Sequence, residues 1–432
     1  DVYKRQEIAE GFNTFFSGVG PNLASEIPDS NKNFKEFLGD PLTSTFIFNR
    51  ITPDIILSLA AKLKPKNSSG PDGISTKLLK EILPVILTPL SHLFDLSLQS
   101  GYVPVQLKIA KVIPVYKSGD KHNYTNYRPI SLLSSFSKLL EKIVAHQMCG
   151  YLYKHKILYE HQYGFRKGHS TTHPVIHFLN KIYTALNKPT SEFTLAIFID
   201  LKKAFDTVNH EILLHKMSHY GFKNKENDWF RSYLDGRQQY VSICNKDSPY
   251  LPMTCGVPQG SVLGPLLFLL FINDLPVATD FLTLLFADDT TLQISSDNLV
   301  NLFLKANNEL EKACAWFQAN KLTLNVSKTK FILFRTKQMS VDFSKYALKI
   351  GDQVIDRIGV NCKEKYFKFV GHRLDEFLSW QYHINHVKGK LSSGNYAISQ
   401  TKNFLPKHIR KTLYNSLCRP HMEFGIIGWA GT

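Results

Sequence analysis

Cysteine is scarce in this sequence, and no two cysteines stand close together. The 432 residues include six cysteines, without a C-x-x-C pair. This spacing excludes the disulfide framework of small secreted domains and a zinc site made of clustered cysteines. We therefore expect the chain to work in a reducing compartment.

Long apolar runs are missing as well. The longest uninterrupted run, residues 266–272, is far shorter than the roughly 18–20 residues that a membrane-spanning helix needs. On this basis we expect neither a membrane-spanning segment nor a membrane partner.

Acidic residues are outnumbered by basic ones. Asp and Glu number 36 against 52 Lys and Arg, which gives a net charge of +16 and favours a polyanionic partner such as nucleic acid or an anionic membrane surface. Residues 321–432 alone hold 19 basic and 7 acidic residues. Aromatic residues lie among these basic residues between positions 366 and 382, as in surfaces that follow a phosphate backbone. Nucleic acid is the expected partner.

The remaining composition is that of an ordinary globular protein. Hydrophobic residues make up 43% and charged residues 20%, which excludes wholesale disorder. Neither an internal repeat nor a flexible linker interrupts the middle of the chain, so about 300 central residues are expected to form one continuous unit. Apolar spacing predicts helices over residues 75–100, 137–158 and 299–320, and strands over residues 109–115, 193–200, 283–286 and 324–334.

Both ends of the sequence are interpreted as cut ends. Residues 1–6 resemble the translated end of a library adaptor, and residues 428–432 follow an apolar aromatic stretch without a helix stop signal. We therefore expect a piece of a longer reading frame.

Two adjacent aspartates mark a candidate site. Asp288 and Asp289 lie between two strand-like runs with room only for a tight turn, so a hairpin would display both at its tip. Such a pair alone is more often a pair of solvated turn residues. A second apolar strand-like run ends in Asp200, and a charge at that point needs a partner. If that strand lies beside the hairpin, the carboxylates converge, and magnesium is the natural ion to neutralise them.

A loop rich in glycine and proline, residues 256–265, precedes the apolar run 266–272. Its glycines would let a ligand approach the backbone, although an ordinary loop before a core helix is an equally common explanation.

In this order, the motifs resemble the palm of a reverse transcriptase. The residues FADD at 286–289 match the family's Y/F-x-D-D, and residues 200–206 match its D-x-x-x-A-F-D. The wordings SGPDGI at 69–74, NYRPISLL at 126–133 and YGFRKGHSTT at 163–172 resemble non-LTR (LINE-type) retrotransposons of the jockey and chicken-repeat group. The resemblance covers roughly residues 65–390 and rests on five linked motifs.

The resemblance implies a two-metal site. Asp200 and Asp288 would bind two Mg²⁺ ions, for which Mn²⁺ is a possible substitute, with Asp289 as the third acid. Lys328 matches the lysine proposed to protonate pyrophosphate in relatives, and Lys330 is the alternative.

The resemblance also implies a nucleotide site. Phe205 falls where the family places the aromatic residue that collides with a ribose 2′-hydroxyl, so deoxynucleotides should be preferred. Arg128 would contact the triphosphate, a role that suits a guanidinium. The implied nucleotide-binding residues are Lys111, Arg128, Lys203, Ala204, Phe205, Gln259 and Gly260.

Contacts with nucleic acid are implied further along the chain. Residues 366–372, which read YFKFVGH, resemble the primer-grip turn, although relatives more often read YLGV there. His383 and His386 are expected to be surface or thumb-helix histidines and not metal ligands. The implied nucleic-acid-binding residues are Arg166, Lys167, Phe369, Val370, Gly371, Lys388 and Lys390.

The fold implied is a right-hand polymerase of the α+β class. It would comprise an N-terminal extension (residues 1–60), fingers (61–190), a palm with an antiparallel sheet (191–375) and a truncated helical thumb (376–432). The activity implied is RNA-directed DNA synthesis from a primer 3′-hydroxyl in target-primed reverse transcription. Its partners would be an RNA template, a DNA primer or target, dNTPs, the element RNA in a ribonucleoprotein and an endonuclease domain outside this sequence, in the nucleus and in cytoplasmic particles.

Two alternatives differ in chemistry or lineage. A decayed or domesticated copy that only binds nucleic acid would be recognised by loss of Asp200, Asp288 or the motif glycines, and none is lost. A group II intron-type reverse transcriptase is disfavoured by the wording at 163–172.

Overall fold

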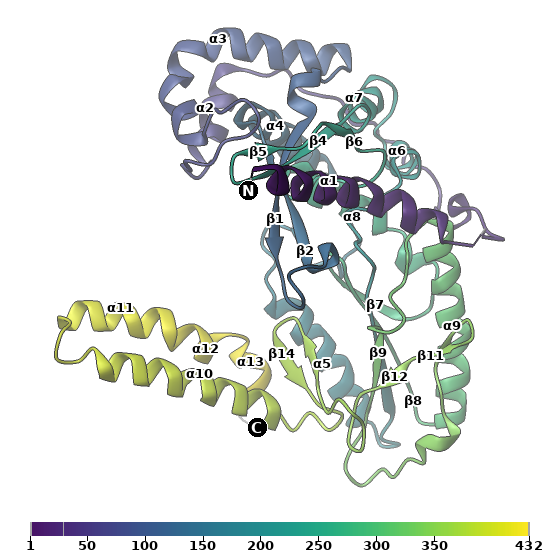
Figure 1. Ribbon diagram of the computed structural model, residues 1–432. Coiled ribbons are helices and arrows are strands. Elements are labelled where there is room, and N and C mark those ends of the chain that lie inside the picture. The colour runs from purple at the N-terminus through teal and green to yellow at the C-terminus, as the bar shows by residue number, and fades with distance from the viewer. Residues whose placement is uncertain (1, 29, 431–432) are drawn as a thin grey trace. The chain divides into compact units, whose positions relative to one another are not determined.

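The computed structural model describes residues 2–28 and 30–430, which fall into two compact units (Figure 1). Unit 1 is built from residues 1–159, 201–278 and 313–324, and unit 2 from residues 160–200, 279–312 and 325–432. The expectation of one continuous central unit was wrong. The chain passes repeatedly between the units, because strands distant in sequence pair within one sheet, and sequence order does not reveal that pairing.

The sheet of unit 1 has the order β2-β1-β4-β5, with β6 also paired to β4. Strand β1 pairs antiparallel with β2 and parallel with β4. Helix α1 covers one face, where Phe12 packs with Ala110, Val112 and Leu133. The bounds are α1 Val2–Ser25, β1 Ile109–Tyr116, β2 Tyr127–Leu133, β4 Gln238–Ile243, β5 Lys246–Asp247 and β6 Leu251–Pro252.

Helix α3, Thr76–Ser100, is the one helix in the described residues that is long and apolar enough to cross a membrane. The expectation of no membrane-spanning segment counted only uninterrupted apolar runs. It did not consider α3, because polar residues interrupt the apolar sequence of this helix. A core helix meets the same criterion, and α3 is hydrogen-bonded into unit 1: the indole of buried Trp229 donates to Ser97 Oγ at 3.1 Å. The other helices of unit 1 are α2 Pro53–Ala61, α4 Ser135–Lys154, α6 His210–His219, α7 Asn224–Leu234 and α8 Leu263–Ile272.

The sheet of unit 2 has the order β12-β9-β3-β8-β7. The pairs β3–β8, β3–β9 and β7–β8 are antiparallel, in agreement with the antiparallel sheet expected for a palm. The pair β12–β9 is parallel. Every residue of β3 is buried, which explains its unbroken apolar run. Helix α5 contributes Phe178 and Ile182 to the core beneath this sheet. The bounds are β3 Phe193–Ile199, β7 Leu282–Phe286, β8 Asp289–Ser296, β9 Lys330–Phe334, β12 Asp356–Arg357 and α5 Thr172–Leu186.

The predicted elements agree with the structure except at one point. The expected strand 324–334 is formed only over β9, because residues 325–329 make a turn in which the Asn325 carbonyl accepts hydrogen bonds from the amides of Lys328 and Thr329. Helix α9, Leu299–Ala319, matches its prediction.

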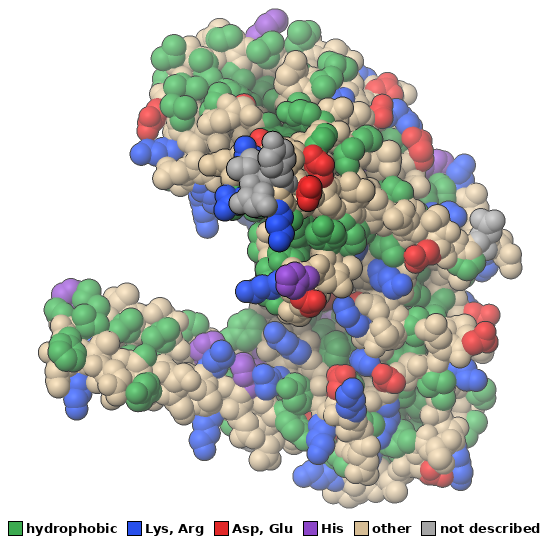
Figure 2. Space-filling view, viewed as in Figure 1, with side chains coloured by type: hydrophobic (Ala, Val, Ile, Leu, Met, Phe, Trp, Pro, Cys, Tyr) green, Lys and Arg blue, Asp and Glu red, His purple; other side chains and the backbone are tan. Residues whose placement is uncertain are grey.

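Two hairpins and a group of helices complete unit 2. Hairpin β13–β14 packs on the core through Phe369 and Leu374. In the segment α10–α13, Phe404 and Tyr396 are exposed. Figure 2 shows several green, apolar side chains on the surface of this segment. The bounds are β10 Lys349–Ile350, β11 Gln353–Val354, β13 Phe367–Phe369, β14 His372–Leu374, α10 Gln381–Gln400, α11 Lys407–Leu417, α12 Arg419–Glu423 and α13 Ile426–Trp429.

Candidate active site

The predicted aspartate hairpin is present in unit 2. Phe286 of β7 pairs with Asp289 of β8, so Ala287 and Asp288 form a two-residue loop. Ala287 has a φ of +59°, the positive value that a type II′ hairpin turn needs at its first loop position. Glycine is the usual residue there. The hairpin therefore displays Asp288 and Asp289 at its tip.

Asp200 reaches the same end of the sheet. Strand β3 pairs with β8 in a register that sets Ile199 opposite Thr290, so the next residue, Asp200, follows opposite Asp289. Neighbouring atoms displace water from the Asp289 carboxyl and raise its pKa to about 6, and the charges of Asp288 and Asp200 add to this rise. The strand register thus brings Asp200, Asp288 and Asp289 to the same end of the sheet.

Two further residues hold Asp200 in place. Asn325 Nδ2 donates to Asp200 Oδ2 at 2.8 Å, and the Asn325 amide donates to the Asp200 carbonyl at 2.8 Å. The Asp200 amide donates to Thr329 Oγ1 at 3.3 Å. The sequence analysis did not identify Asn325 and Thr329 as site residues, although both lie within four residues of the candidate proton donor Lys328.

The same turn separates the two candidate lysines. Lys330 Nζ forms an ion pair with Asp356 at 2.6 Å. Lys328 is exposed in the turn that begins at Asn325. Lys330 is thus engaged by a carboxylate, whereas the side chain of Lys328 is exposed to solvent.

The carboxylates fit a magnesium site that also uses other ligands. Within residues 2–28 and 30–430, no group of three or more His, Cys, Asp or Glu side chains is spaced to hold an ion unaided. Mg²⁺ usually takes only one or two carboxylates and completes its shell with water and substrate phosphates. Burial raises the pKa of Asp289 most and the charges of Asp288 and Asp200 add to this rise, so a divalent cation nearby would favour its charged form.

Unit 1 brings most of the expected nucleotide residues together. Residues 203–207 form a tight turn, in which the Asp206 amide donates to the Lys203 carbonyl at 2.8 Å. The Phe205 ring packs on Phe268, with centroids 4.7 Å apart. The Val257 amide donates to the Phe205 carbonyl at 2.8 Å, which joins this turn to the glycine loop.

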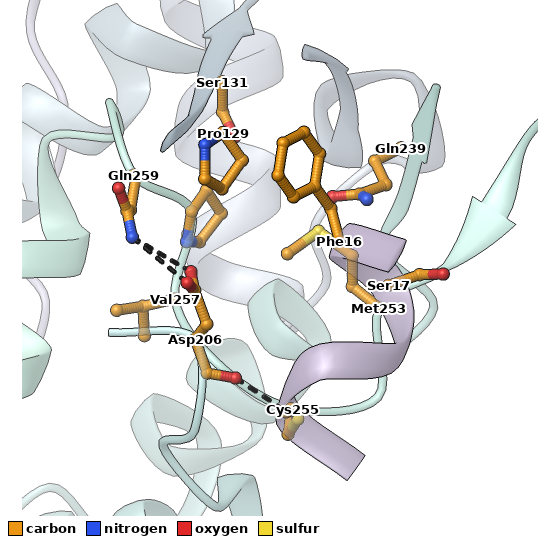
Figure 3. A pocket seen from close by; sticks show the side chains of 12 residues that line it. Phe16, Ser17, Pro129, Ser131, Asp206, Gln239, Met253, Cys255, Val257 and Gln259 are labelled. Carbon is orange, nitrogen blue, oxygen red and sulfur yellow. Dashed lines mark hydrogen bonds between the residues drawn. The ribbon is translucent and has the colours of Figure 1, made fainter. Parts of the chain in front are cut away.

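Gln259 of that loop is held by Asp206. Gln259 Nε2 donates to Asp206 Oδ1 at 3.1 Å and to Oδ2 at 3.2 Å (Figure 3). Burial raises the pKa of Asp206 to about 6, although Lys203 and the Gln259 amide oppose this rise. Gly260 has a φ of +125°, and a Cβ there would lie 2.5 Å from the Ser131 carbonyl oxygen, so glycine is required. Asp206 stood in the motif but was not expected to take part in a site.

A small cavity lies behind this pair, closed by helix α1. Its volume of about 20 Å³ gives room for about one water molecule. Gly20 of α1 is so close to Cys255 Sγ and the Asp206 carbonyl that a Cβ would overlap both. The lining residues are Phe16, Ser17, Gly20, Pro129, Ser131, Asp206, Gln239, Met253, Cys255, Val257, Pro258 and Gln259.

Lys111 and Arg128 lie on the other face of the unit 1 sheet. The register sets Lys111 opposite Leu132 and Arg128 opposite Val115, and cross-strand partners share a face. Residues alternate along a strand, so Pro129 and Ser131, which line the cavity, point to the face that α1 covers. The two predicted cations therefore share a face with each other and not with the cavity.

The residues expected to contact nucleic acid differ in how accessible their side chains are. Arg166 Nη1 donates to the Gln162 carbonyl at 3.0 Å, and Lys167 is exposed. Phe369 is a core residue, 5% exposed, that packs on Phe178. Its side chain is therefore not accessible to nucleic acid, contrary to the prediction. Its alternation within the short strand β13 turns it inward. The turn itself is confirmed, since Val370 and Gly371 both have positive φ values, 42° and 91°.

Helix α10 carries Lys388 and Lys390 exposed. His383 is not a surface residue, because its side of α10 packs against His372 and Trp380 and leaves it 3% exposed. His386 is partly buried.

Comparison with known proteins agrees with the site. Residues 117–374 match the family model described as "Reverse transcriptase (RNA-dependent DNA polymerase)". "Probable RNA-directed DNA polymerase from transposon BS" of Drosophila melanogaster is 33% identical over 319 residues, 70% of this chain and 34% of that protein. "RNA-directed DNA polymerase from mobile element jockey" of the same species is 26% identical over 91% of this chain and 43% of its own length. "Retrovirus-related Pol polyprotein from type-1 retrotransposable element R1" of Bradysia coprophila is 26% identical over 65% of this chain and 28% of that protein.

The chain spans less than half the length of these relatives. A reverse transcriptase domain implies a right-hand polymerase fold, with which the mixed helices and mainly antiparallel sheets agree. The family model covers more than half of the chain, and the relatives are polymerases of non-LTR retrotransposons. The chain therefore belongs to the reverse transcriptase family, and within it the chain is similar to the transposon and mobile-element proteins named above.

Proposed function

We propose that this chain is an RNA-directed DNA polymerase that adds dNTPs to a primer 3′-hydroxyl on an RNA template. The convergence of Asp200, Asp288 and Asp289 at one end of the unit 2 sheet carries this proposal. Asp200 and Asp288 would hold two Mg²⁺ ions, with Asp289 beside them. Two such ions lower the pKa of the attacking hydroxyl and stabilise the charge on departing pyrophosphate.

The residues of the chain would position the reactants. Asn325 holds the Asp200 carboxylate at the end of β3, and Thr329 holds the Asp200 backbone amide. Lys328 would give a proton to pyrophosphate from the adjacent turn. Phe205, fixed against Phe268, would exclude a ribose 2′-hydroxyl, and Gln259, oriented by Asp206, would line the nucleotide pocket.

Further parts of the proposal concern the larger assembly. Residues 61–190, 191–375 and 376–432 would be fingers, palm and part of the thumb, which is supported by the aspartate hairpin in the second range and the exposed lysines of α10 in the third. The chain would act in target-primed synthesis within a ribonucleoprotein that contains the element RNA and an endonuclease, in the nucleus and in cytoplasmic particles. The "retrotransposable element" and "mobile element" names of the relatives support this setting.

Primer extension tests the activity. The intact chain should extend oligo-dT on poly-rA with dTTP and Mg²⁺, and the double variant Asp200→Ala, Asp288→Ala should reduce incorporation to background. Asp297→Ala, an exposed aspartate after the far end of β8, is the matched control and should retain activity. A folded intact chain that binds template but incorporates no nucleotide would instead support the binding-only alternative.

A further inference from the structure

A segment of unit 2 runs along the free edge of the aspartate hairpin. The Leu285 amide donates to the His161 carbonyl at 3.0 Å, and the Tyr163 amide donates to the Leu285 carbonyl at 2.8 Å. Gln162 thereby forms a parallel bridge with Leu285. Strand β7 is paired with β8 on one side and with this segment on the other, so the hairpin is held along both edges.

The Gln162 side chain reaches the catalytic turn itself. Gln162 is 1% exposed, and its Oε1 accepts hydrogen bonds from the Gly164 amide at 2.9 Å and from the Ala287 amide at 3.3 Å. An amide oxygen has two lone pairs, so a single atom can tie the two turns together. The residue that follows Ala287 is Asp288.

Gly164 makes this approach possible. A Cβ at position 164 would overlap the backbone nitrogen of Ala287 and lie 2.9 Å from Ala287 Cα. The obstacle is backbone, which cannot rotate away. Any side chain at this position would push the segment away from the catalytic turn.

Ala287 needs such support. Its φ of +59° lies in the left-handed region, which residues other than glycine adopt only at a cost, so the surrounding structure must impose it. Gln162 Nε2 is buried without a hydrogen-bond partner in the part of the chain that the structure describes. An apolar residue would avoid that cost, which indicates that the acceptor oxygen is the useful half of the amide.

We propose that Gln162 is a positioning residue: its Oε1, together with the close approach at Gly164, fixes the Ala287–Asp288 turn and so aims the Asp288 carboxylate. Its effect on synthesis rests on the proposed function. Its effect on the turn does not.

Hydrogen exchange tests the turn independently of activity. Gln162→Leu removes the acceptor at similar volume, and exchange in the peptide that spans residues 285–290 should speed up about tenfold or more as the turn opens locally. Gln162→Glu keeps acceptor oxygens and replaces only the unpartnered nitrogen, so its exchange should stay closer to that of the unmodified chain. Exchange that Gln162→Leu leaves unchanged would overturn the proposal.

Kinetics then test the consequence. Gln162→Leu should lower kcat for dTTP incorporation about 10²-fold, as expected for a displaced catalytic group, with the template–primer Kd within about threefold. Adding Ala287→Gly should restore part of kcat, because glycine adopts the positive φ without the clamp. Loss of kcat without rescue by Ala287→Gly would assign Gln162 a packing role and overturn the positioning proposal.

The control is Gln293→Leu, another buried glutamine of the same sheet, whose Nε2 donates to the Phe178 carbonyl at 3.3 Å. It should lower thermal stability without changing exchange in residues 285–290. If the intact chain shows no synthesis at all while Gln162→Leu still loosens the turn, the proposed function fails and the positioning of the turn stands.

Discussion

At the scale of single residues, the pKa of Asp289 depends on its burial and on the charges of Asp288 and Asp200. Its pKa of about 6 implies that a metal-free site takes up a proton as the pH falls through this value. We expect a carbon-13 NMR titration of the Asp289 carboxyl to show a midpoint near pH 6 without metal. Saturating Mg²⁺ should lower that midpoint by about one unit or more, because a nearby cation favours the charged form.

Asp200→Asn supplies the control for this titration. It removes one of the two charges that raise the Asp289 pKa, so the metal-free midpoint should fall. A midpoint close to the ordinary value of 3.8 in the unmodified chain would show that the three carboxylates do not interact.

Asp206 leads to a prediction about stability. Because its folded-state pKa is raised to about 6, the folded protein binds this proton more tightly than the unfolded chain does. The stability contribution is therefore full below about pH 4 and is lost as the pH rises through 6. A pKa raised from 3.8 to about 6 corresponds to about 3 kcal/mol.

Urea unfolding at two pH values checks this sign. Asp206→Asn should be more stable than the unmodified chain at pH 8, by up to about 3 kcal/mol, and the difference should shrink at pH 4.5. The exposed Asp297→Asn serves as control and should show no comparable gain. A variant that is destabilised at pH 8 would mean that the ionised Asp206–Gln259 pair is a net stabilising contact.

At the scale of elements, local patterns predicted what is local. Two apolar runs around a pair of turn residues were enough to predict the aspartate hairpin. The apolar run before Asp200 was enough to predict strand β3. Asn325 and Thr329 could not be assigned in this way, because their role depends on Asp200, a partner 125 residues distant from Asn325. The inward side of Phe369 was missed for a similar reason, since it depends on Phe178 beneath the sheet.

Two glycines, Gly371 in the hairpin β13–β14 and Gly389 on α10, allow a matched pair of substitutions. Gly371 has a φ of +91°, and a Cβ there would lie 2.7 Å from the Phe424 ring. Gly371→Ala should therefore lower the free energy of unfolding by about 1–2 kcal/mol. Gly389→Ala on α10 meets no atom within 4 Å and should raise it by about 0.5–1 kcal/mol.

Chemical denaturation of both variants decides the point. Equal effects of the two substitutions would contradict the left-handed turn at Val370 and Gly371. That result would also remove the support for a primer-grip turn at this position.

At the scale of the whole molecule, the basic surplus was a sound guide to the partner class, and the family assignment agrees with it. The arrangement into two units was not predictable, because it depends on the pairing of β3 with β8 and β9 across more than 90 residues. Helix α3 was likewise not predicted as long and apolar enough to cross a membrane, because the expectation counted only uninterrupted apolar runs.

Template binding should depend on the exposed lysines of α10. Lys388→Gln with Lys390→Gln should weaken duplex binding and reduce the slope of log Kd against log salt by up to about 1.8, since each phosphate contact contributes about 0.9. Lys312→Gln with Lys345→Gln removes the same charge from lysines already paired with Glu309 and Asp342. Fluorescence anisotropy at several salt concentrations should show a smaller change for this control, and equal slopes would exclude a specific contact by α10.

Helix α1 leaves the ribosome long before the residues that it packs against. The Thr323 hydroxyl donates to the Leu23 carbonyl at 3.3 Å, so two residues 300 positions apart close unit 1. At about 5–20 residues per second, a ribosome would release the later partner roughly 15–60 s after the earlier one. Until strand β6 has emerged at Pro252, the apolar side of α1, with Phe12 and Phe16, has no finished sheet to cover. Nascent chains are therefore expected to depend on chaperones until residue 252 has emerged, and Thr323 adds its hydrogen bond to α1 later still.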